Sequence, residues 1–376
     1  MDWVTAAIAS AEVPFFAGIS ILLDQYTYHL LFLLAGAFYF VFPDVQKSRL
    51  RLAAFLISLV LVSAAVFSLK AAAQHPRPCV EDPGLLRAPY CPEDYSFPSG
   101  HTALAFAFVG ASLGTRLFPP FLILSIIIAL SRIYLGVHSL SDVMAGMVIG
   151  LASYYVAAAW LRRLVPTLMT EREKVKEGWR KERARWGGFS TEIWRRVAHI
   201  CFGACIIAAV LVVGGPATGL LLMLSVFVGM GAMQLRMRKK RVPVIDEIFG
   251  FLERPGAMPA WGAFMYALGA MLLLSSLEVP QALAGIAVLA LGDGVATLAG
   301  NRFGKGLQIF YNRKKTWAGA LSFFIAGSLG AFPFIGFFAV PLALTCAAAE
   351  TLDIGIDDNL LVPLAAILFF VVFFIA

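Results

Sequence analysis

The chain has 376 residues, of which 60% are hydrophobic and 14% are charged, and its formal net charge is +7. This composition excludes an ordinary soluble domain and is typical of a polytopic membrane protein. The basic residues gather in short segments between apolar runs, so they indicate membrane topology and do not indicate nucleic-acid binding.

The N-terminal apolar runs predict a first helical bundle over residues 1–165, because a membrane-spanning helix needs roughly 20 mostly apolar residues. Residues 4–23 are interrupted by Glu12 and Pro14, so they fit either a span or a helix in the membrane interface. The clearer spans are 27–43, 50–70, 101–117, 119–135 and 140–161.

Basic residues between these spans predict the orientation of the bundle. They mark one side, which the positive-inside rule makes cytoplasmic: Lys47, Arg49, Arg51, Arg116, Arg162 and Arg163. Residues 166–190 then carry dense mixed charge without an apolar run, which is typical of a solvated cytoplasmic linker.

The second half of the chain, residues 191–376, predicts another bundle. Its expected spans are 198–213, 217–235, 257–276, 281–299, 318–337, 338–350 and 360–376. Basic clusters at 195–196, 236–241 and 302–315 fall on one side, together with the polar motifs around Asp293, Asn312 and Asp357. The fold class is therefore all-α: two transmembrane helical bundles of a multi-pass cell-membrane protein, joined by a charged cytoplasmic linker.

Polar residues among the apolar runs of the first bundle form a candidate phosphate site. Charges at the ends of membrane helices are expensive to place and indicate function. Arg77 and Arg132 can each hold two phosphate oxygens, and Lys70 adds a point charge. Ser99 and Gly100 offer donors at a helix start, where the dipole favours anions. Counting spans places this site on the extracytoplasmic face.

Two histidines predict the chemistry of this site. His138 and Asp142 are four residues apart, so they share a helix face and the carboxylate can orient the imidazole. This makes His138 the expected nucleophile. His101 would protonate the leaving lipid oxygen and later activate water. Such a mechanism requires no metal or other cofactor.

Three ordered motifs carry a family resemblance: Lys70-x6-Arg77-Pro78, Pro98-Ser99-Gly100-His101 and Ser131-Arg132-x5-His138-x3-Asp142. The pattern resembles the phosphatidic acid phosphatase type 2 superfamily over roughly the first 165 residues. The resemblance implies a membrane lipid phosphatase. The alternative is that these charges only anchor helix ends at the interface.

Cys79 and Cys91 flank a polar, proline-rich loop between the first two motifs. The predicted topology places this loop in an oxidising compartment, where a disulfide bond can persist. The loop has little apolar surface to pack, so we expect the two cysteines to be bonded. Two free thiols are the alternative, since spacing alone does not establish proximity.

A second candidate site centres on Asp293, a carboxylate within an apolar helix and between glycines. We expect it to bind Mg²⁺ that carries a nucleotide triphosphate. Basic residues would stabilise the transferring phosphoryl group, and acidic residues follow nearby. They are Lys305, Arg313, Lys314 and Lys315, and Glu350, Asp357 and Asp358. A buried structural carboxylate paired with Arg302 is the alternative.

Several motifs follow one another in the second half: Glu192-x3-Arg196-x2-His199, Glu253-Arg254, Gly292-Asp293-Gly294-x5-Gly300-Asn301-Arg302-Phe303-Gly304, Tyr311-Asn312-Arg313-x-Lys315-Thr316-Trp317-Ala318-Gly319, Glu350-Thr351 and Asp357-Asp358-Asn359-x3-Pro363. They resemble the phytol kinase and dolichol kinase family, which uses CTP. The resemblance covers roughly residues 190–376 and adds to the expected kinase site Arg196, Asn301, Arg302, Asn312, Thr316 and Asn359. His199 belongs to the same pattern but could equally cap a helix. Two positions depart from the pattern. Thr297 stands where many phytol kinases carry a second Asp, and Ala318 stands where related cytidylyltransferases and some dolichol kinases carry Glu.

Together these patterns predict a bifunctional enzyme of isoprenoid lipid metabolism. An outward-facing phosphatase would act on a polyprenyl or dolichyl diphosphate or a related lipid phosphate. An inward-facing kinase would phosphorylate a polyprenol with CTP and Mg²⁺. The alternatives are a phosphatase fused to a CDP-lipid-forming enzyme, a phosphatidate phosphatase fused to a diacylglycerol kinase, and a lipid transporter. The exact lipid and the oligomeric state are not predicted.

Overall fold

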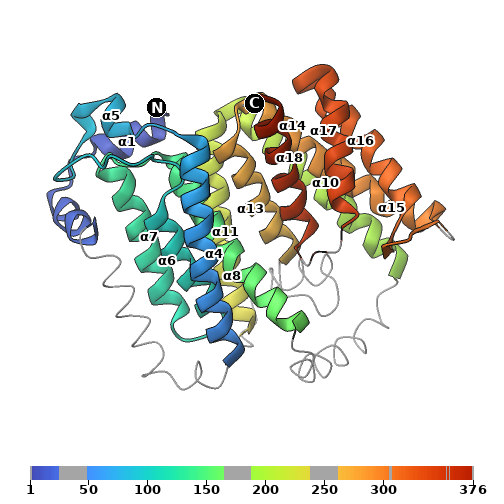
Figure 1. The fold of residues 1–376 in the computed structure, drawn as a ribbon, viewed down its shortest axis with the longest axis horizontal. Helices are drawn as coiled ribbons and strands as arrows, with labels where there is room; N and C mark the ends of the chain where they lie inside the picture. Colours follow the sequence, from blue (N-terminus) through green and yellow to red (C-terminus); the bar gives the residue numbers. More distant parts are fainter. Residues whose placement is uncertain are drawn as a thin grey trace. The chain divides into compact units, whose positions relative to one another are not determined.

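The computed structural model describes residues 2–24, 49–164, 188–237, 261–304, 307–352, 354 and 356–374. The chain divides into two compact units, Met1–Pro166 and Thr167–Ala376, each described by itself below. The expected span 27–43, residues 166–187 of the expected linker, and Lys305 lie outside the described residues. Helices dominate both units, which confirms the all-α prediction (Figure 1).

The first unit is a helical bundle whose long helices match the predicted spans. Its elements are α1 (Trp3–Ser10), a helix over Pro14–Asp24, α4 (Arg49–Ala73), α5 (Pro78–Glu81), the 3₁₀ turn η1 (Pro83–Leu85), α6 (Gly100–Ser112), α7 (Phe118–Tyr134) and α8 (Leu140–Leu164). Helix α8 packs against both α4 and α6.

The first apolar stretch is not one straight helix. The chain bends by 106° between the helices Trp3–Ser10 and Pro14–Asp24. Pro14 starts the second helix, where its missing N–H costs no hydrogen bond. The hydroxyl of Thr5 accepts a hydrogen bond from the backbone N–H of Leu140 at 2.8 Å. Helix α1 is thereby tied to the start of α8.

Close contact between α6 and α8 brings two of the sequence motifs together. A Cβ atom at Gly150 would lie 2.2 Å from the carbonyl oxygen of Ala103, so only glycine allows this approach. The backbone N–H of Ser99 donates to the carbonyl oxygen of Asp142 at 3.0 Å. The start of α6 is therefore held beside the first turn of α8.

The second unit contains eight α-helices among the described residues, with short non-α segments between them. The elements are α10 (Gly188–Val213), α11 (Gly215–Met237), α13 (Trp261–Ser276), α14 (Val279–Ala287), η3 (Val288–Gly292), α15 (Asp293–Phe303), β1 (Gln308–Ile309), β2 (Asn312–Thr316), α16 (Trp317–Ile335), η4 (Gly336–Phe338), α17 (Ala339–Glu350) and α18 (Asp358–Phe374).

Two features of this unit were not predicted. Segment η3 is a π-helical turn directly before Asp293, inside the continuous helical span Val279–Phe303. Such bulges often occur at functional sites. Strands β1 and β2 form an antiparallel hairpin in a basic segment that has no alternating apolar pattern. Helices α16 and α17 pack on each other, as expected for two separate apolar runs joined by a turn.

The apolar helices make the chain a multi-pass membrane protein. Among the described residues, six helices are long and apolar enough to cross a membrane, or seven if the bent N-terminal pair counts as one span.

Candidate active sites

The first unit gathers its predicted site residues from five places in the chain. Lys70 lies in the last turn of α4, and Arg77 precedes α5. The start of α6 provides Ser99, Gly100 and His101, the end of α7 provides Arg132, and the loop and first turn of α8 provide His138 and Asp142. His101 interacts electrostatically with the cations and with His138, so these residues form one cluster.

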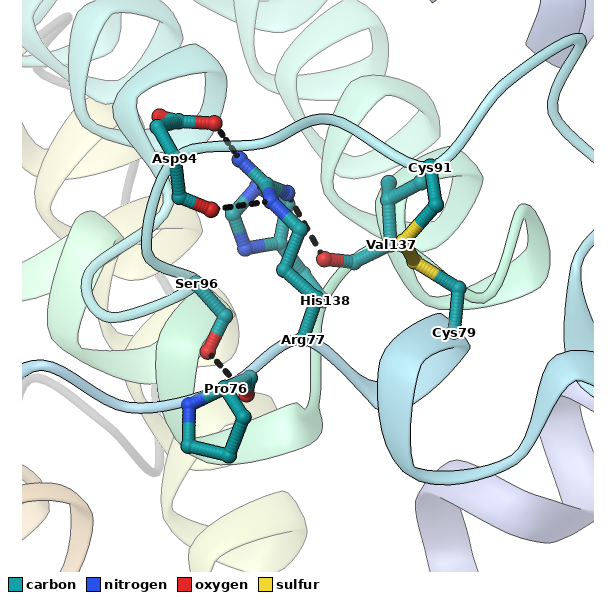
Figure 2. The surroundings of a disulfide bond; sticks show 8 residues. All are labelled: Pro76, Arg77, Cys79, Cys91, Asp94, Ser96, Val137 and His138. Carbon is teal, nitrogen blue, oxygen red and sulfur yellow. Dashed lines mark hydrogen bonds and ion pairs between the residues drawn. A yellow bond between two sulfur atoms is a disulfide. The ribbon is translucent and has the colours of Figure 1, made fainter.

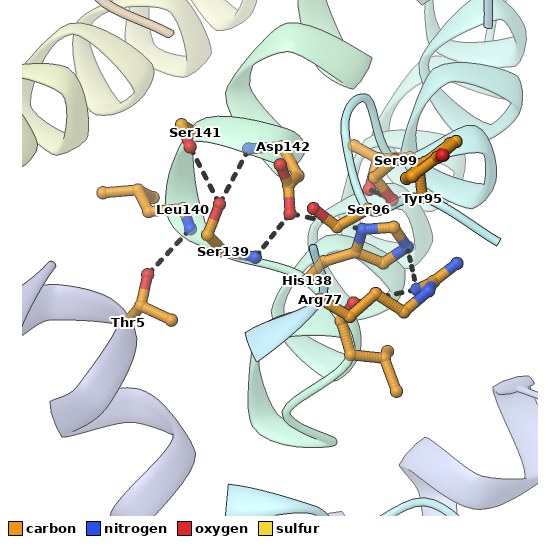
Figure 3. A network of polar contacts seen from close by, with 12 residues as sticks. Thr5, Arg77, Tyr95, Ser96, Ser99, His138, Ser139, Leu140, Ser141 and Asp142 are labelled. Atoms are coloured by element: carbon orange, nitrogen blue, oxygen red, sulfur yellow. Dashed lines mark hydrogen bonds and ion pairs between the residues drawn. The ribbon is translucent and has the colours of Figure 1, made fainter. Parts of the chain in front are cut away.

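His138 has a distinct partner for each ring nitrogen. Its Nδ1 lies 3.5 Å from the Oδ2 atom of Asp142, and its Nε2 lies 3.2 Å from the Nη1 atom of Arg77. The backbone N–H of Ser139 donates to the same Asp142 oxygen at 2.7 Å (Figure 3). The carboxylate thus orients the ring, and Nε2 is the nitrogen that faces the cationic group.

The protonation state of His138 suits a nucleophile. Burial lowers the pKa of His138 to about 4, although the Asp142 carboxylate acts in the opposite direction. The imidazole is therefore neutral at ordinary pH, with a lone pair available on one nitrogen.

Asp94 is a site residue that the sequence analysis missed. Its Oδ2 atom lies 2.6 Å from Nζ of Lys70. Its Oδ1 atom lies 2.5 Å from Nη2 of Arg77 (Figure 2). Burial alone would raise the pKa of Asp94, but the hydrogen bonds from Lys70 and Arg77 lower it to about 2. The available signal was a carboxylate in the polar loop between two cationic motifs.

Arg132 has a carboxylate partner of its own. The guanidinium is 1% exposed and forms an ion pair with Asp24, whose side chain is 17% exposed. Its Nη2 also donates to the carbonyl oxygen of Ser20 at 3.4 Å. Spacing along the chain could not reveal this pair, because Asp24 and Arg132 are 108 residues apart.

The loop that carries Asp94 is closed by a disulfide bond. Cys79 and Cys91 are bonded, with their Cα atoms 6.0 Å apart (Figure 2). Both cysteines pack against Leu135 and Val137, which shortly precede His138 in the chain. Farther along, the hydroxyl of Ser96 donates to the carbonyl oxygen of Pro76 at 3.0 Å. These contacts hold the loop against Arg77.

The second unit surrounds Asp293 with basic groups from α10. The Oδ2 atom of Asp293 lies 2.5 Å from Nη1 of Arg196 and 3.5 Å from Nε2 of His199. His199 Nε2 also lies 3.2 Å from the carbonyl oxygen of Leu289, within the π-helical turn. The ion partner of Asp293 is thus Arg196, whereas Arg302 is exposed at the end of α15.

Lys315 connects two further carboxylates of this site. Its ammonium group pairs with Glu350 at the end of α17 and, at 2.9 Å, with Asp358 at the start of α18. Burial alone would lower the pKa of Lys315, but the charges of Asp358 and Glu350 raise it. Lys315 is therefore a stable cation among these acids.

The acidic residues of this site fit a divalent metal ion. Carboxylate oxygens of Asp293, Glu350 and Asp358 lie within 4.8 Å of one another, from three different helices. Hard cations such as Mg²⁺ prefer carboxylate oxygens as ligands. The donor set is larger than the single ligand, Asp293, expected from the sequence.

Other predicted kinase-site residues shape the surroundings of this cluster. Asn312 donates through its amide to the carbonyl oxygen of Thr351 at 2.8 Å, and the hydroxyl of Thr316 caps α16 by accepting from Gly319 N–H at 3.1 Å. Asp357 accepts from the side-chain amide of Asn359 at 3.0 Å.

Asp357 is partly buried, whereas Asn301 and Arg302 at the end of α15 are exposed. Burial raises the pKa of Asp357 to about 6. Asn301 and Arg302 are exposed eight and nine residues after Asp293, a distance of about 12 Å along a helix. The structure does not bring them to the carboxylates.

Comparisons with known proteins relate two parts of the chain to different families. The sequence profile of the PAP2 superfamily matches residues 51–166. The crystal structure of Aquifex aeolicus LpxE aligns with 28% identity, covering 41% of this chain and 92% of that one, at a TM-score of 0.34. An uncharacterized protein of Methanocaldococcus jannaschii is 33% identical over 46% of this chain and 88% of its own length.

Phytol kinases match the C-terminal region. The phytol kinase of Synechocystis is 28% identical over 47% of this chain and 77% of that enzyme. A probable phytol kinase of Glycine max is 34% identical over 24% of this chain, and the match spans 37% of that protein. These homologies support a hydrolase and a kinase activity. The chain unites a PAP2 superfamily domain at residues 51–166 with a C-terminal region homologous to phytol kinases.

Proposed function

We propose that the protein is a bifunctional lipid enzyme that removes a phosphate group from an isoprenoid lipid phosphate or diphosphate and phosphorylates a polyprenol-type alcohol with CTP. If the lipid is a polyprenol such as dolichol, both reactions yield the lipid monophosphate. A phosphatidate phosphatase fused to a diacylglycerol kinase would instead reverse its own reaction, which disfavours that pair.

The observation that carries the phosphatase proposal is the setting of His138. Its Nε2 faces Arg77, and its Nδ1 faces Asp142. In the proposed reaction Nε2 attacks phosphorus, the bond to the leaving oxygen breaks, and His101 gives that oxygen a proton. His101 then takes a proton from water as the water attacks the phosphohistidine, which releases inorganic phosphate.

The kinase proposal rests on the carboxylates around Lys315. Asp293, Glu350 and Asp358 would hold Mg²⁺, and a bound Mg²⁺ would supply positive charge that offsets the charge of the nucleotide phosphates. Lys315 and Arg196 lie beside these carboxylates and would stabilise negative charge on the transferring phosphoryl group. The alcohol oxygen attacks the γ-phosphorus, and CDP leaves.

We propose that the phosphatase site opens to the extracytoplasmic side and the kinase site to the cytoplasm. The alternation of basic segments supports this orientation, as does the Cys79–Cys91 bond, which persists in an oxidising compartment. Access of a membrane-impermeant thiol reagent to single cysteines introduced at Glu93 and Arg313 tests the assignment. Labelling of both from the same side would contradict it.

Product analysis of the purified protein tests the two activities. A panel of polyprenols, polyprenyl diphosphates and diacylglycerol would be offered with CTP or ATP. Label from the γ-phosphate of CTP should enter the lipid, whereas label from the α-phosphate should not. Entry of the α-label would identify a CDP-lipid-forming enzyme. Lipid translocation without phosphate release or transfer would identify a transporter.

A further inference from the structure

The carboxylate of Asp94 occupies donors that a phosphoryl group also needs. Arg77 gives Asp94 two hydrogen bonds, from Nη2 to Oδ1 at 2.5 Å and from Nε to the carbonyl oxygen at 2.8 Å. Lys70 gives Oδ2 one at 2.6 Å and also contacts the carbonyl oxygen of Tyr95. One short loop segment therefore engages two of the three cations of the phosphatase site.

The same guanidinium lies against the nucleophile. Nη1 of Arg77 is 3.2 Å from Nε2 of His138, so phosphorus under attack by Nε2 would come within reach of Arg77 (Figure 2). A phosphate oxygen and the Asp94 carboxylate would then compete for one planar set of donors. Arg77 cannot donate its full set of hydrogen bonds to both groups at the same time.

The two carboxylates that pair with the site's cations differ in their freedom to move. Both arginines are buried, but Asp24 is only 17% exposed, so its carboxylate has little access to solvent if it leaves Arg132. The Asp94 side chain is 58% exposed. It can turn into solvent at little desolvation cost, which fits a displaceable group.

We propose that Asp94 is an internal competitor for the phosphate position, which weakens the binding of every phosphate ligand and so keeps inorganic phosphate, the product, weakly bound. The proposal rests on the phosphatase function above. The apparent affinity of a ligand that must displace Asp94 is its intrinsic affinity multiplied by the fraction of time that the cations are free of Asp94. A lipid substrate offsets this loss through contacts of its apolar chain. Inorganic phosphate, the product, has no such contacts and is released.

The competitor is charged throughout the working pH range. The hydrogen bonds from Lys70 and Arg77 hold the pKa of Asp94 at about 2, against the effect of burial. The charged groups facing it are Lys70 and Arg77, with His138 beyond them. We therefore expect the competition to be constant between about pH 5 and 8.

The test is the inhibition constant of unlabelled inorganic phosphate against release of radiolabelled phosphate from a polyprenyl phosphate in detergent micelles. Asp94→Asn should lower that constant by about tenfold, and by the same factor at pH 5.5 and 7.5. Glu93→Gln is the matched control: it removes the same charge one residue away, and Glu93 forms no ion pair among the described residues. We expect its constant to match that of the wild type.

An unchanged constant in Asp94→Asn, or an increased one, would overturn the proposal, since an increase would mean that Asp94 positions the cations for phosphate. The rise in melting temperature with added inorganic phosphate gives a second readout on the full chain, independent of activity. It should be larger for Asp94→Asn than for Glu93→Gln. If the wild type hydrolyses no lipid phosphate, the phosphatase function fails, and the melting comparison still decides the role of Asp94.

Discussion

The two polar sites of this chain have opposite arrangements of charge. In the first unit, His138 lies among cations. Each arginine forms an ion pair with a carboxylate: Arg77 with Asp94, and Arg132 with Asp24. In the second unit, three carboxylates converge, with Lys315 between two of them. A cationic site can bind a phosphate directly, whereas an anionic site needs a metal ion before it can hold a nucleotide. The comparison predicts that each site fails under a different treatment.

The largest expected effect comes from His138→Ala. Loss of the proposed nucleophile should reduce phosphate release by at least about 10⁴-fold, while the proposed CTP-dependent phosphorylation of an alcohol remains, because the two sites belong to separate units. Both activities would be measured on the same purified sample. Full phosphatase activity in this variant would refute the assignment of His138.

Asp293→Asn should produce the reverse pattern. It removes one charge from the carboxylate cluster with almost no change of volume, so we expect kinase activity to fall by about 10²- to 10³-fold. EDTA should have the same selective effect. If EDTA abolished phosphate release as well, the two sites would not differ in their need for a metal.

The disulfide bond gives an intermediate effect on stability. Cys79 and Cys91 are 12 residues apart, and a bridge across such a loop contributes roughly 3 kcal/mol in the chain-entropy model. Replacing both by serine should lower the melting temperature of the phosphatase unit and leave the kinase activity intact. Equal melting curves would contradict this. Mass spectrometry of non-reduced protein checks the bond itself.

A change of pH is the smallest perturbation that tests the difference between the two sites. Burial lowers the pKa of His138 to about 4, so kcat/KM of the phosphatase should stay high below pH 6.5 and decline only near pH 4. A fall centred at pH 6.5 would contradict a buried neutral imidazole.

Stability of the first unit should follow the same window with a definite sign. An unfolded chain takes up a proton on this histidine near pH 6.5, whereas the folded one does so only near pH 4. The contribution of His138 to stability is therefore full above pH 6.5 and is lost as the pH falls toward 4. Acid titration of the melting temperature, with His138→Ala for comparison, measures it.

Local patterns were sufficient for much of this protein. Apolar run length predicted α4, α7, α8 and most helices of the second unit closely, because a membrane imposes a minimum length on every span. Helix α10 is the exception, since it begins at Gly188, before the predicted span 198–213.

The spacing of His138 and Asp142 predicted that their side chains would lie close together, and they do. The expected shared helix face was wrong, because α8 begins at Leu140 and His138 lies in the loop before it. The sequence of the second half identified Asp293 as a candidate site residue, because a carboxylate in an apolar run is costly and therefore indicates function.

Only the tertiary structure decided which charges meet. Arg132 pairs with Asp24, Asp293 pairs with Arg196 rather than Arg302, and Lys315 joins Glu350 to Asp358. These partners are separated by tens of residues or more, and helix packing, which no local spacing encodes, brings them together. Asp94 is the clearest case: a loop carboxylate becomes part of the candidate phosphate site because the folded loop places it between Lys70 and Arg77.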